Sequence, residues 1–161
     1  MYTLSVIVII SFLVGMIIMD IIISSNTDTK KIEIEKKKWQ YYFSILNMWL
    51  DLKQQNKGIV QYMKEHGYLR IAIYGASDLG NRLFSELKNS EIDVVCVIDK
   101  RNNVLGDFKL ISPDDEVPSV DLLVVCAEFY FDEIKSFMKK KVDCPILSLS
   151  GLLGNAFKRN L

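Results

Sequence analysis

The sequence predicts an α/β protein, in which a parallel sheet with flanking helices follows a transmembrane helix and a long amphipathic helix. Two observations lead to this fold class. Beyond residue 68, short apolar runs alternate with stretches of helical periodicity, which is typical of buried parallel strands covered by helices. Before that point, a long apolar run is followed by a striped helical segment. We therefore expect an anchor at 1–25, a juxtamembrane helical segment at 26–67 and an α/β domain at 68–161.

The anchor is predicted from the apolar run at residues 4–23. As a helix, this run would cross about 30 Å of hydrocarbon, which is one bilayer. Asp20 lies near its end, where a carboxylate can reach the interface. No Lys or Arg precedes Lys30, whereas lysines follow closely, so the positive-inside rule places the following chain in the cytoplasm. The sequence predicts an uncleaved, single-pass protein of the cell membrane with a cytoplasmic domain.

The juxtamembrane segment carries an apolar stripe with helical spacing. Its members are Trp39, Tyr42, Phe43, Leu46, Trp49 and Leu50. Such a stripe either packs against the core of its own chain or docks on a partner helix or a second copy. Both interpretations remain open at this stage.

Charge and cysteine usage exclude several classes of function. The chain has 20 basic and 20 acidic residues, without the basic surplus that nucleic-acid binding requires. We therefore expect no nucleic-acid partner. Cys96, Cys126 and Cys144 are widely spaced in apolar runs, which favours packing in the core over a disulfide or metal site.

The α/β domain is predicted from its alternating strands and helices. Strands are expected at 69–74, 94–98, 122–126 and 146–149, with a short one at 108–111. Helices are expected at 59–65, 79–88 and 132–140, with a short helix at the end. This order predicts right-handed crossovers between parallel strands.

A glycine-containing turn follows the first predicted strand. It reads Gly75-Ala76-Ser77-Asp78-Leu79-Gly80 and leads into a helix. Dinucleotide-binding folds place their phosphate turn here, with one glycine for the tight turn and another for close helix packing. Ser77 stands where the central glycine of that motif would be, and its Cβ narrows the approach of a phosphate. Asp78 would repel a phosphate at the helix start, unless its side chain points away.

Further candidate binding residues follow the second and third strands. Asp99 ends the second strand, where an acid usually binds a ribose diol. Lys100 and Arg101 follow it and could compensate a nearby phosphate, or could simply lie in a solvated loop. Ala127 and Glu128 follow the third strand and would border the same crevice. Tyr130 could line it as well, or the aromatic residues 129–131 could instead seal the core before the helix. The alternative is an ordinary strand-to-helix turn in a domain without a ligand, because fold alone does not confer binding.

Three stretches carry a resemblance to a known group of domains: IAIYGASDLGNRLFSEL, VVCVIDK and VDLLVVCAEFYFDEI. They resemble small Rossmann-like domains of bacterial surface-polysaccharide and glycosyltransferase systems, including the NAD(P)-binding part of nucleotide-sugar epimerases and dehydratases and the N-terminal domain of some sugar acetyltransferases. The resemblance implies that Gly75, Ser77 and Gly80 cradle phosphates of NAD(P) or a nucleotide-sugar, and that Asp99 meets a ribose or uridine. It also implies an accessory role in glycan biosynthesis, with a glycosyltransferase-type partner on the Trp39–Leu50 stripe.

Catalytic signatures are missing from the sequence. It has no Tyr-x-x-x-Lys pair, no catalytic triad and no spacing typical of metal ligands. His66, the single histidine, precedes Gly67 at a predicted helix end, which favours capping or surface exposure over catalysis. We therefore expect a binding module. The alternatives are an epimerase- or dehydratase-like enzyme that needs a partner subunit, and a ligand-free interaction protein.

Overall fold

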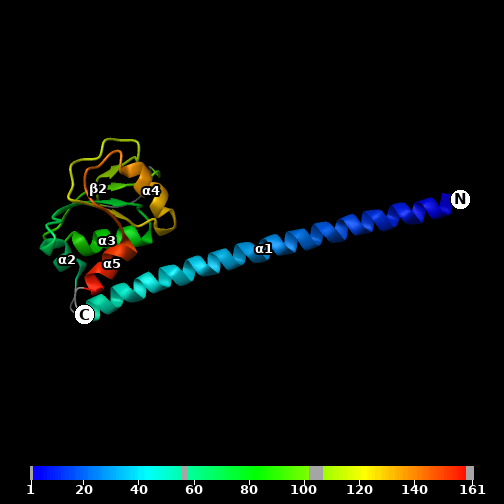
Figure 1. Ribbon diagram of the computed structural model, residues 1–161, viewed down its shortest axis with the longest axis horizontal. Helices are drawn as coiled ribbons and strands as arrows, with labels where there is room; N and C mark the ends of the chain where they lie inside the picture. The colour runs from blue at the N-terminus through cyan, green and yellow to red at the C-terminus, as the bar shows by residue number, and fades with distance from the viewer. Residues whose placement is uncertain (1, 56–57, 102–106, 159–161) are drawn as a thin grey trace. The chain divides into compact units, whose positions relative to one another are not determined.

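The computed structural model describes residues 2–55, 58–101 and 107–158, and for residues 2–11 and 20–28 it describes the backbone only (Figure 1). The chain divides into two compact units, residues 1–46 and 47–161.

Helix α1 forms the first unit and continues into the second as a single element, Tyr2–Gln54, of 53 residues. The predicted anchor and the predicted amphipathic helix are therefore parts of one helix, which no proline interrupts. Within the described residues, no helix has both the length and the apolar character of a membrane span. Much of the predicted span at 4–23, namely 4–11 and 20–23, has side chains outside the described residues.

The predicted apolar stripe on α1 is not one uniform face. Trp39 and Phe43 are 69% and 66% exposed, whereas Trp49 is buried. In the second unit, the indole Nε1 of Trp49 donates a hydrogen bond to Glu86 Oε2 at 2.7 Å, and Leu52 is also buried. The last turns of α1 thus contribute to the core of the α/β unit, as one of the two interpretations expected.

The second unit contains a parallel sheet, which confirms the predicted α/β class. Within the described residues the sheet has five strands in the order β3-β2-β1-β4-β5, all paired in parallel. The strands are β1 Arg70–Tyr74, β2 Asp93–Ile98, β3 Leu110–Ile111, β4 Leu122–Val125 and β5 Ile146–Ser148. The order reverses direction at β1, as it does in doubly wound dinucleotide-binding folds.

Helices cover both faces of this sheet. They are α2 Ile59–Glu65, α3 Asp78–Leu87, the 3-10 helix η1 Glu128–Tyr130, α4 Phe131–Met138 and α5 Leu149–Lys158. Met138 of α4 packs in one cluster with Ala72, Cys96 and Leu123, on one face of the sheet. Gly80 of α3 lies beside Ile73, which alternates with Ala72 and therefore points to the other face. Figure 1 shows α3 and α4 on different sides of the strands.

The cysteines pack as predicted. All three are free, and Cys96 and Cys126 are buried while Cys144 is partly buried. Burial raises the pKa of the Cys126 thiol far above its usual range, with a smaller contribution from the charge of Glu128. The thiols therefore stay protonated at neutral pH and act as small apolar side chains.

Candidate functional site

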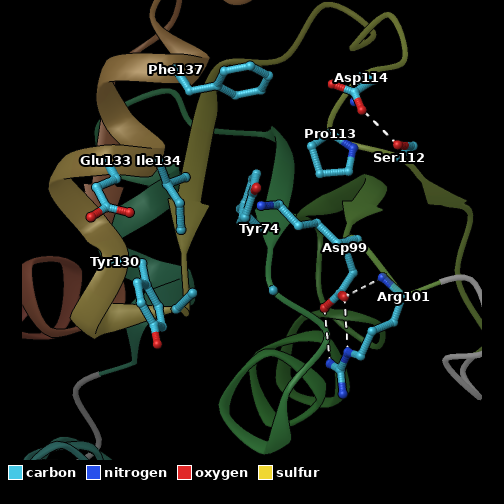
Figure 2. A pocket seen from close by; sticks show the side chains of 13 residues that line it. Tyr74, Asp99, Arg101, Ser112, Pro113, Asp114, Tyr130, Glu133, Ile134 and Phe137 are labelled. Atoms are coloured by element: carbon cyan, nitrogen blue, oxygen red, sulfur yellow. Dashed lines mark hydrogen bonds and ion pairs between the residues drawn. The ribbon is translucent and has the colours of Figure 1, made fainter.

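A cavity of about 910 Å³ opens at the carboxyl ends of the central strands (Figure 2). Its floor comes from the ends of β1, β2 and β4, and its walls come from the segment after β3 and from η1 and α4. The lining residues are Tyr74, Gly75, Asp99, Lys100, Arg101, Ser112, Pro113, Asp114, Ala127, Tyr130, Glu133, Ile134 and Phe137. Open α/β sheets bind their ligands at this edge, where the strand order reverses.

The turn after β1 depends on two glycines. Gly75 has a φ of 100°, a conformation that residues with side chains rarely adopt, and its N–H donates to Ile98 O at 2.8 Å. A Cβ built on Gly80 would lie 2.0 Å from Gly75 O, so α3 approaches the turn too closely for any side chain. Gly75 thus permits the turn and Gly80 permits the close approach of α3.

The other turn residues lie outside the cavity lining. Ser77 precedes α3 without a capping hydrogen bond from its side chain, and Asp78 is the first helical residue; both are exposed. Leu79 is buried in the core and Ala76 is buried in the turn. Of the six predicted turn residues, only Gly75 lines the cavity.

Asp99 is the most heavily hydrogen-bonded group of the cavity and is only 8% exposed. Its Oδ2 accepts from Ala76 N at 2.7 Å and from Arg101 Nη2 at 3.0 Å. Its Oδ1 accepts from Arg101 N at 2.9 Å and from Arg101 Nε at 3.0 Å, and Figure 2 shows these side chains in contact. Arg101 Nη2 also donates to Ala76 O at 3.0 Å. The Asp99–Arg101 pair therefore holds both backbone polar groups of Ala76 in the glycine turn.

These contacts set the ionisation of the groups in the cavity floor. Burial alone would raise the pKa of Asp99, but the hydrogen bonds from Arg101 and Ala76 and the charge of Arg101 hold it below its usual range. Burial raises the pKa of Tyr74, and the charges of Asp99 and Asp114 raise it further. At neutral pH the floor thus presents an ionised carboxylate and a neutral phenol.

The outer wall of the cavity carries apolar side chains beside the acids Asp114 and Glu133, and a lysine holds part of it in place. Tyr130 and Phe137 are 59% and 41% exposed, and Pro113 lines the cavity from the segment after β3. Lys141 Nζ donates to Pro113 O at 2.6 Å and to Asp115 O at 3.1 Å, and it lies 5.3 Å from the centre of the Phe137 ring. Of these residues, only Tyr130 was a candidate from the sequence, where no motif marks Pro113, Phe137 or Lys141.

Of the candidate residues after the second and third strands, the structure places some in the cavity lining and one outside it. Ala127 lines the cavity beside Gly75, and Lys100 lines it after β2. Glu128 is buried, and its carboxylate accepts hydrogen bonds from Ser150 N and Ser150 Oγ, both at 2.7 Å. Glu128 therefore ties the end of β4 to the first turn of α5 and does not line the cavity.

His66 ends a helix and is exposed, as predicted, and it is not among the residues that line the cavity. It caps α2, and its Nδ1 lies 2.9 Å from Tyr62 O. Its ring packs at 4.1 Å between centroids against Tyr62. Among the described residues, no group of three or more His, Cys, Asp or Glu side chains is arranged to hold a metal ion.

Comparison with known proteins gives one family match. Residues 67–144 match the family model described as C2185-like, N-terminal. This segment runs from the end of α2 to the approach of β5 and contains every residue that lines the cavity. No curated protein and no solved structure matches the chain.

Proposed function

We propose that the α/β unit binds a nucleotide or nucleotide-sugar in the cavity at the carboxyl edge of its sheet. The observation that carries the proposal is the position of this cavity at the reversal of strand order. There the Gly75 turn and Asp99, the acid that follows β2, lie together, as in dinucleotide-binding folds.

Size and chemistry support a ligand of this class. A cavity of about 910 Å³ falls within the range of about 300 to 1,000 Å³ that is typical of small-molecule sites. Tyr130 and Phe137 offer partly exposed aromatic faces on which a base or a sugar ring could stack. Lys100 offers a positive charge for a phosphate.

The biological setting is part of the same proposal. Residues 4–23 would anchor the chain in the cell membrane with the α/β unit in the cytoplasm, and the domain would serve glycan or surface-polysaccharide biosynthesis by delivering or sensing its ligand. The support is the apolar run, the lysines that follow it and the resemblance described above. Resistance of the native chain to alkaline carbonate extraction would agree with the anchor, and release by carbonate would contradict it.

Binding is tested by thermal unfolding of the full-length chain in detergent, with NAD(H), UDP-sugars and coenzyme A added separately. A ligand at a hundredfold excess over its dissociation constant should add about 2.7 kcal/mol to the free energy of unfolding. An unchanged melting temperature with every ligand would contradict the proposal.

A matched pair of variants then locates the site. Tyr130 lines the cavity, whereas its neighbour Phe129 is 47% exposed and lies outside the lining. Tyr130→Ala should weaken binding about tenfold or more, because an aromatic stacking partner contributes about 1 to 3 kcal/mol. Phe129→Ala should leave the affinity unchanged. Equal losses in the two variants would place the ligand elsewhere.

A further inference from the structure

The carboxylate of Asp99 has no acceptor position left for a ligand. An ionised carboxylate accepts about four hydrogen bonds. Oδ1 receives Arg101 N and Arg101 Nε, while Oδ2 receives Ala76 N and Arg101 Nη2. All four donors belong to the chain itself. With Arg101 in this position, Asp99 cannot accept hydrogen bonds from a ribose diol.

Arg101 keeps part of its donor capacity. The guanidinium has five N–H donors, and those of Nε and Nη2 point to Asp99 and to Ala76 O. Nη1 has no hydrogen-bond partner among the described residues. The Arg101 side chain is 62% exposed and lines the cavity, as does the exposed Lys100. This part of the cavity therefore presents positively charged hydrogen-bond donors. A free Asp99 carboxylate at the same place would present acceptors instead.

The acids of the other walls restrict where a phosphate can lie. Asp114 comes from the segment after β3 and Glu133 from α4, and Figure 2 shows both apart from the Arg101 guanidinium. A phosphate near either carboxylate would be repelled. The anionic part of a ligand is thus favoured near the Arg101 guanidinium, and its uncharged part belongs beside Tyr130 and Phe137.

We infer that Arg101 is a specificity-determining residue, and that it selects nucleotides with a phosphate monoester on the ribose over nucleotides with a free ribose diol. The inference rests on the proposed nucleotide function. If the Gly75 turn faces the pyrophosphate, the end of β2 faces the ribose. There the ribose meets Arg101 in place of a free carboxylate. A phosphate on the 2′ or the 3′ oxygen fits beside Arg101, and the experiment distinguishes the two.

The test compares two ligand pairs that differ by this one phosphate. Dissociation constants are measured by titration calorimetry on the full-length chain for NADP⁺ and NAD⁺, which probe the 2′ position. The same is done for coenzyme A and 3′-dephospho-coenzyme A, which probe the 3′ position. In one of the pairs, the phosphorylated member should bind at least tenfold more tightly, and the ratio should shrink as salt rises.

Variants of Arg101 test whether this residue causes the preference for the phosphorylated ligand. Arg101→Gln should bring the ratio close to one without weakening the unphosphorylated ligand, because Asp99 is then free to accept the diol. Arg101→Lys should retain part of the ratio, because the charge remains but the paired donors are lost. Arg70→Gln is the matched control. Arg70 lies 4.0 Å from Asp93 at the amino end of the same sheet, and its removal should leave the ratio unchanged.

The outcomes separate the two proposals. Binding of NAD⁺ or a UDP-sugar without a preference for the phosphorylated ribose, or a ratio that Arg101→Gln leaves unchanged, overturns the inference and leaves the proposed function standing. The absence of binding by every ligand overturns both. Melting temperatures of the variants, measured without ligand, exclude misfolding as the cause of a lost preference.

Discussion

Asp99 and Glu128 invite comparison, because they are the two buried acidic side chains of the described residues and are each 8% exposed. Each follows a parallel strand, and each accepts a backbone N–H that lies more than 20 residues away, from Ala76 and from Ser150 respectively. They differ in their remaining partners. Asp99 holds a partly exposed arginine at the mouth of a cavity, whereas Glu128 holds the hydroxyl of Ser150 outside the cavity lining. The same chemistry thus builds a candidate recognition site in one place and a structural tie in the other.

The largest expected effect concerns a glycine near the backbone that each acid holds. Gly80 lies in α3, after the turn that Asp99 holds, and Gly151 follows Ser150, which Glu128 holds. Gly80→Ala should destabilise the protein by about 3 kcal/mol or more, because the added Cβ would meet backbone 2.0 Å away. Gly151 of α5 is the matched site, since its Cβ would meet only the Ser148 hydroxyl, at 3.0 Å. Gly151→Ala should change stability by less than about 1 kcal/mol, because that hydroxyl can rotate and alanine favours the helix. Urea unfolding of both variants measures the difference, and equal losses would show that the β1–α3 turn is not unusually tight.

The next effect separates the two acids by function. Glu128→Gln should lower stability by about 1 to 3 kcal/mol, because the hydrogen bonds to Ser150 lose their charged acceptor. It should leave nucleotide affinity unchanged. Asp99→Asn should instead alter the ratio of affinities for phosphorylated and unphosphorylated ribose, because Arg101 loses its anchor. Calorimetric titration of both variants checks this, and a changed ratio in Glu128→Gln would remove the distinction between the acids.

A smaller effect concerns pH. The folded pKa of Asp99 lies below its unfolded value, so the unfolded chain binds the proton first as the pH falls. The stabilisation from Asp99 is therefore present above about pH 4 and is lost as the pH drops through the folded pKa. With Asp99→Asn or Arg101→Gln, the free energy of unfolding should fall less steeply as the pH is lowered through this acidic range. A curve of unfolding free energy against pH tests this, and an unchanged slope would show that the pair does not depress the pKa.

The smallest expected effect concerns the outer wall of the cavity, which Asp99 lines and Glu128 does not. Lys141→Met should cost less than about 1 kcal/mol, because the lysine contacts lie near the surface. It should still speed hydrogen exchange at the Ser112 and Asp115 amides, which are bonded within the segment that Lys141 holds. Lys139→Met is the control, because Lys139 is exposed on the same helix end. Equal exchange in the two variants would show that the wall is held by other contacts.

The sequence predicted the fold class and part of the site, because those signals are local. The alternation of apolar runs located the strands, and the spacing of Gly75 and Gly80 located the turn. Asp99 was predicted from its position at the end of a strand. The sequence also shows that Asp99 stands two residues before Arg101, but only the structure shows that Arg101 donates hydrogen bonds to both carboxylate oxygens of Asp99.

Other features depend on contacts between distant segments and could not be predicted. Glu128 was expected at the ligand, but Ser150 lies 22 residues further along the chain and comes beside it only after β5 pairs with β4. The wall held by Lys141 has no pattern of its own in the sequence. On α1, the exposed Trp39 and the buried Trp49 belong to one helical spacing, so periodicity alone could not distinguish them.

The pairing of β1 has a consequence for the order in which the cavity is assembled during folding. β1 pairs with β2, which follows it after one crossover, and with β4, which follows much later. Loop closure costs more entropy for the more distant partner, so the β1–α3–β2 unit should form first. That unit already contains Gly75, Ala76 and Asp99. The aromatic wall on η1 and α4 can dock only after β4 has joined, so the polar half of the cavity precedes the apolar half.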